Sequence, residues 1–239
     1  MKIIGIIPAR LDSTRLPRKA LININNKTLI QRVYENTRKA NILENIFVAT
    51  NDLEIQKNIK SFGGQFIVTK KSHLNGTERC NEAINNLKMH VFENDVIVNI
   101  QCDEPMIEKG VLESIYNTFI QNPKLEIVSV ASTYINNNEM SDQSVVKVHL
   151  NSAHFATKFC RIAKKNSGML KHVGIYAYRK ETLQKLANLK PTSLEKAEKL
   201  EQLRWLENKY HIKCIVTPKK YFSINTKQDL NNYKENYIL

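Results

Sequence analysis

The chain has 239 residues, of which 42% are hydrophobic, a length and composition that suffice for the full core of one α/β domain. Its net charge of +13 comes mainly from lysines spread along the chain, without a basic tail or a nucleic-acid-binding motif, so nucleic acid is not an expected partner. The four separated cysteines argue against a zinc site or a disulfide framework, and no apolar run suits a signal peptide or membrane insertion. We therefore expect one cytoplasmic domain over residues 1–239.

The first half of the chain alternates between strand-like and helix-like segments. Apolar β-formers predict strands at residues 2–7, 46–50, 65–68 and 96–100. Helical periodicity or polarity predicts helices at residues 28–39, 52–61, 77–88 and 111–121. This order is typical of a mostly parallel sheet with helices on both faces. The predicted fold class is therefore α/β and Rossmann-like.

The second half follows a different pattern. Strand-like segments at residues 127–133, 145–150 and 174–178 lack long intervening helices, which predicts a smaller antiparallel extension of the sheet. Residues 193–208 predict one helix, with Leu194, Ala197, Leu200 and Leu203 as its inward stripe. Residues 151–169 carry cations and a glycine, and we expect them to form a mobile surface connection.

The segment 8–19 concentrates charge directly after the first predicted strand. It contains four cationic side chains and three hydroxyl or carboxyl side chains, and its two prolines exclude a regular helix or a central strand. Ligands of open α/β sheets bind at the carboxyl ends of strands, where backbone N–H groups and cations face anions. The segment is therefore predicted to bind phosphate, although the glycine-rich fingerprints are absent. A solvated basic loop is the alternative interpretation.

Four motifs in this chain resemble one known family. Pro-Ala-Arg-x-x-Ser-Thr-Arg-Leu-Pro-x-Lys at 8–19 is similar to the signature of the 3-deoxy-manno-octulosonate (Kdo) cytidylyltransferases, the CMP-Kdo synthetases. Three further motifs follow in the family's order: Asn-Gly-Thr-Glu-Arg at 75–79, Gln-Cys-Asp-Glu-Pro at 101–105 and Lys-His-Val-Gly-Ile-Tyr-Ala-Tyr-Arg at 171–179. The resemblance covers nearly the whole chain. It implies a single-domain nucleotidyltransferase that uses CTP and Mg²⁺ to activate Kdo or a related 2-keto sugar acid, releasing pyrophosphate, for lipopolysaccharide or other surface polysaccharide synthesis. It also implies a homodimer.

The resemblance divides the expected site residues into four groups. Catalysis is assigned to Arg15, Lys19 and Asp103, and the metal to Asp103 and Asn225. The nucleotide side is assigned to Arg10, Ser13, Arg15, Lys19, Asn75, Gly76 and Arg79. The sugar acid is assigned to Gln101, Arg161, His172 and Glu195. An arginine can donate hydrogen bonds to two oxygens at once, and a lysine acts as a point charge. Both side chains therefore suit a leaving group that gains negative charge.

The segment 75–79 allows two interpretations. In the family this element resembles a cytosine reader, and Asn75 stands where Ser is usual but keeps donor and acceptor capacity. Gly76 permits a close backbone approach, and Thr77 suits a helix cap. The alternative is a plain capped helix start, because capping signals are common.

Departures from the family pattern gather on the sugar and metal sides. Asp103 follows the predicted strand 96–100 and suits Mg²⁺, which binds one or two carboxylates plus substrate phosphates. Cys102 replaces a Gly, Lys196 replaces a frequent Gln, Asn225 replaces an Asp, and the stretch after Arg161 is shortened. We expect the nucleotide preference to be kept and the sugar preference to have shifted. The alternative function is a catalytically weakened paralogue that binds nucleotide or sugar in a regulatory or structural role.

Overall fold

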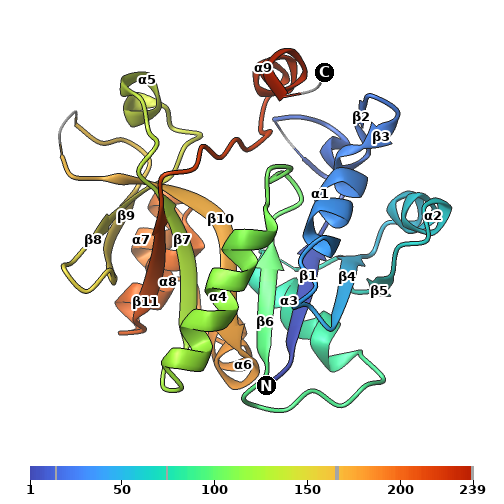
Figure 1. Ribbon diagram of the computed structural model, residues 1–239, viewed down its shortest axis with the longest axis horizontal. Coiled ribbons are helices and arrows are strands. Elements are labelled where there is room, and N and C mark those ends of the chain that lie inside the picture. The colour runs from blue at the N-terminus through green and yellow to red at the C-terminus, as the bar shows by residue number, and fades with distance from the viewer. Residues whose placement is uncertain (14, 74, 165–166, 238–239) are drawn as a thin grey trace.

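The computed structural model describes residues 1–13, 15–73, 75–164 and 167–237 (Figure 1). Its centre is a mixed sheet in the order β11-β7-β10-β6-β1-β4-β5. These strands are β1 (Ile3–Pro8), β4 (Asn45–Thr50), β5 (Phe66–Val68), β6 (Val96–Ile100), β7 (Ile127–Ser132), β10 (Leu170–Arg179) and β11 (Ile212–Thr217). β1 pairs in parallel with β4 and β6, whereas β10 runs antiparallel to β6 and β7. β8 (Lys147–Leu150) pairs antiparallel with β10 and with β9 (Ala156–Cys160).

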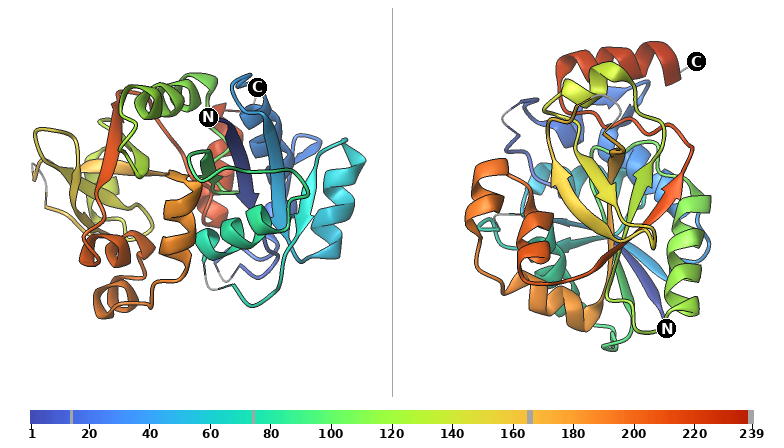
Figure 2. Two further views of the ribbon diagram at one scale, coloured as in Figure 1. Left: turned by 90° about the horizontal axis from the view of Figure 1, so that it is seen from below. Right: turned by 90° about the vertical axis from the view of Figure 1, so that its left-hand side faces the viewer.

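Helices cover both faces of the sheet (Figure 2). One face carries α1 (Leu29–Arg38) and α4 (Lys109–Gln121), and the other carries α3 (Gly76–Asn85), α6 (Lys180–Ala187) and α8 (Glu201–Glu207). The remaining helices are α2 (Leu53–Ser61), α5 (Asn137–Ser141), α7 (Ser193–Glu198) and α9 (Lys227–Tyr237). A short 3-10 helix, η1 (Lys19–Leu21), precedes a hairpin formed by β2 (Asn23–Ile24) and β3 (Lys27–Thr28). Within the described residues, no helix has the length and apolar character to cross a membrane.

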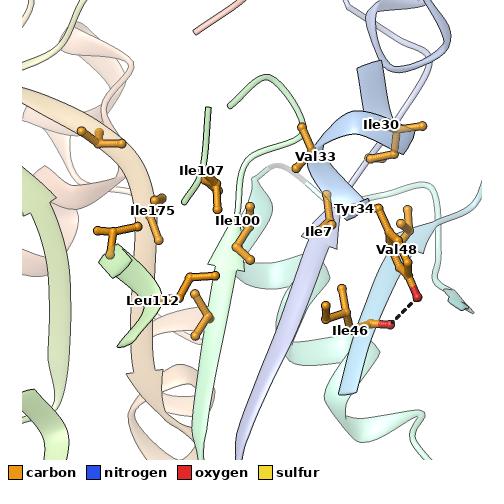
Figure 3. Packing of buried hydrophobic residues seen from close by; sticks show 14 of the residues in the cluster. Ile7, Ile30, Val33, Tyr34, Ile46, Val48, Ile100, Ile107, Leu112 and Ile175 are labelled. Atoms are coloured by element: carbon orange, nitrogen blue, oxygen red, sulfur yellow. Dashed lines mark hydrogen bonds between the residues drawn. The ribbon is translucent and has the colours of Figure 1, made fainter. Parts of the chain in front are cut away.

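The apolar core explains why the parallel strands read as unbroken hydrophobic runs. All six residues of β1 are buried, because each face of this central strand packs under a helical layer. On one face, Ile7, Val33 and Ile100 pack together between α1, α4 and the sheet (Figure 3). In the same layer the Tyr34 hydroxyl donates to the Ile46 carbonyl at 3.5 Å. Full burial of each such aliphatic side chain contributes about 1.5–3 kcal/mol.

The predicted α/β class and the predicted antiparallel extension are both confirmed. Each helix and strand expected in the first half is present within a few residues of its predicted bounds. In the second half, the antiparallel pairing of β10 with β6, β7 and β8 supplies the extension. The predicted strand at 174–178 is the end of a longer strand that begins at Leu170.

Three local predictions were wrong. Residues 193–208 form two helices, because Lys199 adopts a left-handed conformation with φ 54° and ends α7; Leu194 is consequently exposed. The segment 151–169 contains β9, which pairs with β8 through apolar positions such as Phe159, so it is more ordered than expected. The cap of α3 is Asn75 and not Thr77, which lies inside the helix.

Several elements were not anticipated, among them α5, α6, α9, β9 and β11. β11 and α9 are joined by residues 218–226, which we call the C-terminal strap. The strap crosses the edge of the sheet where β1 and β6 end (Figure 1). Its position follows from two contacts: the Ile224 N–H donates to the Asp103 carbonyl at 2.9 Å, and Lys171 donates to the Tyr221 carbonyl at 2.9 Å. The strap thereby brings the end of the chain to the carboxyl end of β6.

Candidate active site

Two adjoining cavities lie at the carboxyl ends of β1 and β6. The loop cavity, of about 310 Å³, is bounded by the segment after β1, the start of α3 and the segment after β6. The strap cavity, of about 490 Å³, is bounded by β10, α5, α8 and the C-terminal strap. Five residues line both cavities and form their junction: Arg15, Gly76, Gln101, Asp103 and Asn225. Twelve of the thirteen predicted site residues line one cavity or both, and the exception is Glu195.

The segment after β1 forms the cationic wall of the loop cavity. Its path is fixed by the Leu11 N–H, which donates to Asp52 Oδ2 at 2.8 Å, and by the Ser13 N–H, which donates to the Leu11 carbonyl at 2.8 Å. Arg18 adopts φ 56° and pairs with Glu54 on the surface, so the chain turns and directs Lys19 inward. The predicted residues Arg10, Ser13, Arg15 and Lys19 all line the cavity. Thr14 of the motif lies outside the described residues.

Lys19 lines the loop cavity and contacts two residues of the junction. Its ammonium lies 2.6 Å from Asp103 Oδ2 and 3.3 Å from Asn225 Oδ1, and Arg15 Nη2 donates to the same Asn225 oxygen at 3.1 Å. Burial lowers the pKa of Lys19, but the Asp103 carboxylate outweighs this effect and the pKa is raised overall, so Lys19 stays charged. The fold therefore brings three segments that are distant in sequence onto one cationic group.

Asp103 and Asn225 provide a donor set that suits a hard cation. Both present an oxygen to the same ammonium nitrogen, so a carboxylate and an amide oxygen converge on one point. Mg²⁺ is usually held by one or two protein oxygens together with substrate phosphates and water. Among the described residues, no group of three or more His, Cys, Asp or Glu side chains could hold a metal without such help. The residues present therefore fit a magnesium ion shared with a phosphate ligand.

The start of α3 is stabilised by its own side chains. Asn75 Oδ1 accepts from the Glu78 N–H at 2.8 Å, and Asn75 Nδ2 donates to Glu78 Oε1 at 3.0 Å, so both ends of the amide are engaged in the cap. The buried Arg79 donates through Nη1 to Asn51 Oδ1, Thr69 Oγ1 and the Lys70 carbonyl, and its burial lowers its pKa. Arg79 thus lines the cavity while holding the connection between β5 and α3.

The segment after β6 is packed tightly against the start of α3. A Cβ on Gly76 would lie 3.2 Å from Gln101 Nε2 and 3.3 Å from Asn99 Nδ2, which explains why glycine stands there. Cys102 lines the loop cavity and is not among the described residues with positive φ, so its backbone needs no glycine. Burial raises the pKa of its thiol to about 11, which keeps it protonated.

His172 is a neutral wall of the strap cavity. Ser129 Oγ donates to the Ile175 carbonyl at 2.8 Å, and because a hydroxyl has one proton, it accepts from His172 Nε2 at 2.9 Å. The ring is therefore protonated on Nε2, and Nδ1 is left as an acceptor. Burial lowers the pKa of His172 to about 3, so the ring stays uncharged near neutral pH. A neutral acceptor of this kind suits a substrate hydroxyl.

Arg161 also lines the strap cavity, and its guanidinium ties together three backbone segments. It donates to the carbonyls of Gln143, Glu198 and Lys199 at 2.8, 2.8 and 2.9 Å, and its burial lowers its pKa. These contacts join the end of β9 to the turn between α7 and α8. Arg161, the predicted partner of the substrate carboxylate, therefore lies at the cavity wall and also stabilises that wall.

The prediction for Glu195 differs from what the structure shows. Its carboxylate forms a two-bonded ion pair with Arg204 at 2.6 Å and completes a capping box with Thr192, outside the strap cavity. Lys196 is exposed and likewise outside the cavity lining, so it does not face the expected sugar position. One helix later, Glu201 and Gln202 supply a carboxylate and an amide that do line the cavity. Burial raises the pKa of Glu201 to about 8.

Glu201 and Gln202 were not singled out in the sequence, where the sugar-side residues followed the family resemblance and residues 193–208 were predicted to form one helix. No local pattern marked these two residues, because the helix break at Lys199 that sets their position cannot be read from helical periodicity.

Glu104 is a second group that sequence reasoning did not resolve. It is only 3% exposed, and its Oε1 accepts from the Gly174 N–H at 3.2 Å and from Ser223 Oγ of the strap at 2.5 Å. Burial, followed by the neighbouring Asp103 charge, raises its pKa to about 6. A Cβ on Gly174 would lie 3.0 Å from Glu104 Oε1, so glycine is required for this close approach. Glu104 therefore joins β10 to the strap that carries Asn225.

Comparison with known proteins agrees with this geometry. A family model described as cytidylyltransferase matches residues 4–215. The 3-deoxy-manno-octulosonate cytidylyltransferases of Bacteroides thetaiotaomicron and Phocaeicola vulgatus are 39% and 40% identical to this chain, covering 98% and 96% of it and 98% and 95% of their own lengths. A solved structure of CMP:2-keto-3-deoxy-manno-octonic acid synthetase complexed with CTP superposes with a TM-score of 0.88 at 32% identity, covering 98% of both chains.

Proposed function

The chain belongs to the cytidylyltransferase family, and we propose that it transfers a cytidylyl group from CTP to Kdo or a closely related 2-keto sugar acid. The observation that carries the proposal is the junction, where Lys19 contacts both Asp103 and Asn225 between the two cavities. A reaction between two bound substrates needs such a shared wall, with cations beside the atoms that react. CTP would occupy the loop cavity and the sugar acid the strap cavity.

In this reaction a sugar hydroxyl oxygen attacks the α-phosphorus of CTP. The new P–O bond forms as the bond to the β-phosphate oxygen breaks, so pyrophosphate carries away the negative charge and the hydroxyl proton passes to solvent or a nearby base. Arg10, Arg15 and Lys19 line the place where that charge develops. Fixed cations at such a position typically contribute a factor of about 10² to 10³ each. Positioning and electrostatics therefore supply most of the catalysis that this chain provides.

We further propose that Mg²⁺ binds at Asp103 and Asn225, where its charge would offset that of the phosphates. The two converging oxygens and the nearby cationic wall support this site. Asp103→Asn should remove most of the magnesium-dependent turnover, because the only carboxylate of the pair is lost. A matched change at Asp142, which lines the far side of the strap cavity, should leave the magnesium requirement unchanged when Asp142→Asn is assayed in parallel.

On the sugar side we propose that Gln101, Arg161 and His172 contact the acid, joined by Glu201 and Gln202 from α8. Glu195 remains a prediction of the family resemblance, with Arg204 as its partner in this structure. The altered neighbours Cys102 and Asn225 line the cavities, whereas Lys196 does not. A cytoplasmic location, action as one domain, and assembly into a homodimer are further parts of the proposal, resting on the family resemblance.

The test is pyrophosphate release from CTP, UTP or ATP in the presence of several 2-keto sugar acids and Mg²⁺. We expect release with CTP and Kdo or a near analogue, with CTP preferred over UTP. Absence of release with CTP and every acid would favour the weakened paralogue instead. That alternative is less well supported, since the phosphate-side cations, Asp103 and Asn225 converge in one place.

A further inference from the structure

His73 is a polar group of the loop cavity that neither the motifs nor the reaction has used. It lies on the connection between β5 and α3 and lines the cavity with a side chain that is 14% exposed. Its Nε2 is hydrogen-bonded to the Glu82 carboxylate of α3, and the same carboxylate oxygen accepts from the Lys70 N–H at 2.9 Å. The hydrogen bond to Glu82 of α3 therefore orients the His73 ring at the wall of the loop cavity.

This contact fixes which ring nitrogen carries the proton. An ionised carboxylate can only accept hydrogen bonds, so the nitrogen that faces Glu82 must donate and Nε2 carries the hydrogen. In the neutral imidazole the other nitrogen, Nδ1, is then an acceptor. Among the described residues no hydrogen bond to His73 Nδ1 is present. The side chain consequently offers a fixed acceptor whose tautomer is set by a charged neighbour.

We assign His73 to the nucleobase side of the loop cavity, because the cationic segment 8–19 forms the phosphate side and His73 comes from the separate connection between β5 and α3. The α-phosphorus of CTP must lie near the junction, because the sugar hydroxyl attacks from the strap cavity. The base must then extend toward residues that line the loop cavity alone, and His73 is one of these. Asn75 and Arg79 lie there too, but the Asn75 amide is engaged by Glu78, and Arg79 holds Asn51, Thr69 and Lys70.

We propose that His73, oriented by Glu82, determines the preference for cytosine by accepting a hydrogen bond from the exocyclic amine of the base. The inference rests on the proposed use of CTP and names the group that selects it. Cytosine carries an amine donor at ring position 4, whereas uracil carries an oxygen acceptor there. A fixed acceptor pairs with the amine of cytosine and repels the oxygen of uracil. A site that hydrogen-bonds one substrate can reject an analogue without the matching group by a factor on the order of 10⁴.

The experiment measures kcat/KM for CTP and for UTP in wild-type protein and in His73→Phe, which keeps an aromatic ring but has no acceptor. The ratio of the two values should fall by at least about tenfold, mainly through the loss of CTP efficiency. His149→Phe, an exposed histidine on β8, is the matched control and should keep the wild-type ratio. Equal losses for both nucleotides, or an unchanged ratio, would overturn the inference, since a phosphate contact would not distinguish the bases.

Two variants at Glu82 keep the inference testable if His73→Phe does not fold. Glu82→Leu removes the acceptor that fixes the tautomer and should lower the ratio by about tenfold, whereas Glu82→Gln retains an acceptor oxygen and should stay within about threefold of wild type. Similar ratios in these two folded variants would also count against the role. Failure of the proposed function gives a different result, since wild-type protein would then release no pyrophosphate from CTP.

Discussion

The two cavities differ in how their polar groups are arranged. The wall of the loop cavity presents arginines and a lysine from one short segment, and Arg10 and Arg15 are exposed to solvent. The strap cavity is walled by buried groups such as Glu104 and His172, which are bonded to neighbouring strands. The first arrangement suits a highly charged anion that brings its own charge. The second suits a hydroxyl-rich substrate, whose shape must be matched by groups fixed in advance.

This difference makes a general prediction about variants. The exposed cations of the loop cavity, Arg10 and Arg15, can be truncated with little loss of folding stability, so their effects should appear in turnover. Side chains behind the strap cavity hold the wall together, so their loss should lower stability and weaken sugar binding at the same time.

Lys19→Ala should reduce turnover by about a hundredfold or more, because it removes a fixed cation beside the leaving group. The melting temperature should fall as well, because the ion pair with Asp103 is largely buried, with side chains 12% and 18% exposed, and its loss leaves that carboxylate without its cation. Arg18→Ala is a matched control from the same segment, where the side chain pairs with Glu54 on the surface. Turnover and thermal melting measured on both variants decide the matter, and near-normal turnover in Lys19→Ala would contradict the role of this segment.

The contrast also explains which parts of the molecule could be predicted. The loop cavity is formed largely by short contiguous motifs at the ends of parallel strands, so residues such as Arg15, Lys19 and Asp103 could be placed from the strand order together with the family resemblance. The strap cavity combines β10, α8 and the strap, which are brought together by tertiary contacts that leave no local pattern. Glu195, which was assigned from the family resemblance, lies outside this cavity, and the break at Lys199 that separates it from Glu201 is not visible in helical periodicity.

Lys147→Met should test the strap-cavity side of the contrast. The fully buried ammonium of Lys147 donates to the carbonyls of Asp142, Val145 and Arg161 at 2.6, 2.8 and 2.6 Å. Methionine would leave these carbonyls without that donor, which should cost about 1–3 kcal/mol of unfolding free energy. The KM for the sugar acid should rise several-fold while the KM for CTP stays near its wild-type value. A rise in the CTP value alone would contradict the division between the cavities.

Asn225→Asp should strengthen magnesium binding at the junction, where Asn225 lines both cavities. A carboxylate at this position adds negative charge toward a hard cation, so the Mg²⁺ concentration for half-maximal turnover should fall several-fold. Arg15 and Lys19 already donate to the Asn225 side-chain oxygen and would accommodate the added charge. A magnesium titration of wild-type and variant protein gives the answer. An unchanged or higher requirement would show that this side chain does not face the metal.

The stability of the strap-cavity wall should also depend on pH through His172. The pKa of His172 is lowered to about 3 by burial, whereas an unfolded histidine titrates near 6.5. The unfolded chain therefore takes up a proton first as the pH falls, so this contribution to stability is complete above about pH 6.5 and is lost below it, at about 1.4 kcal/mol per pH unit. His172→Gln can still donate to Ser129 Oγ but does not titrate. Chemical unfolding between pH 7.5 and 5.0 should show wild type losing its advantage over His172→Gln as the pH falls, and a constant difference would mean that the folded ring is protonated normally.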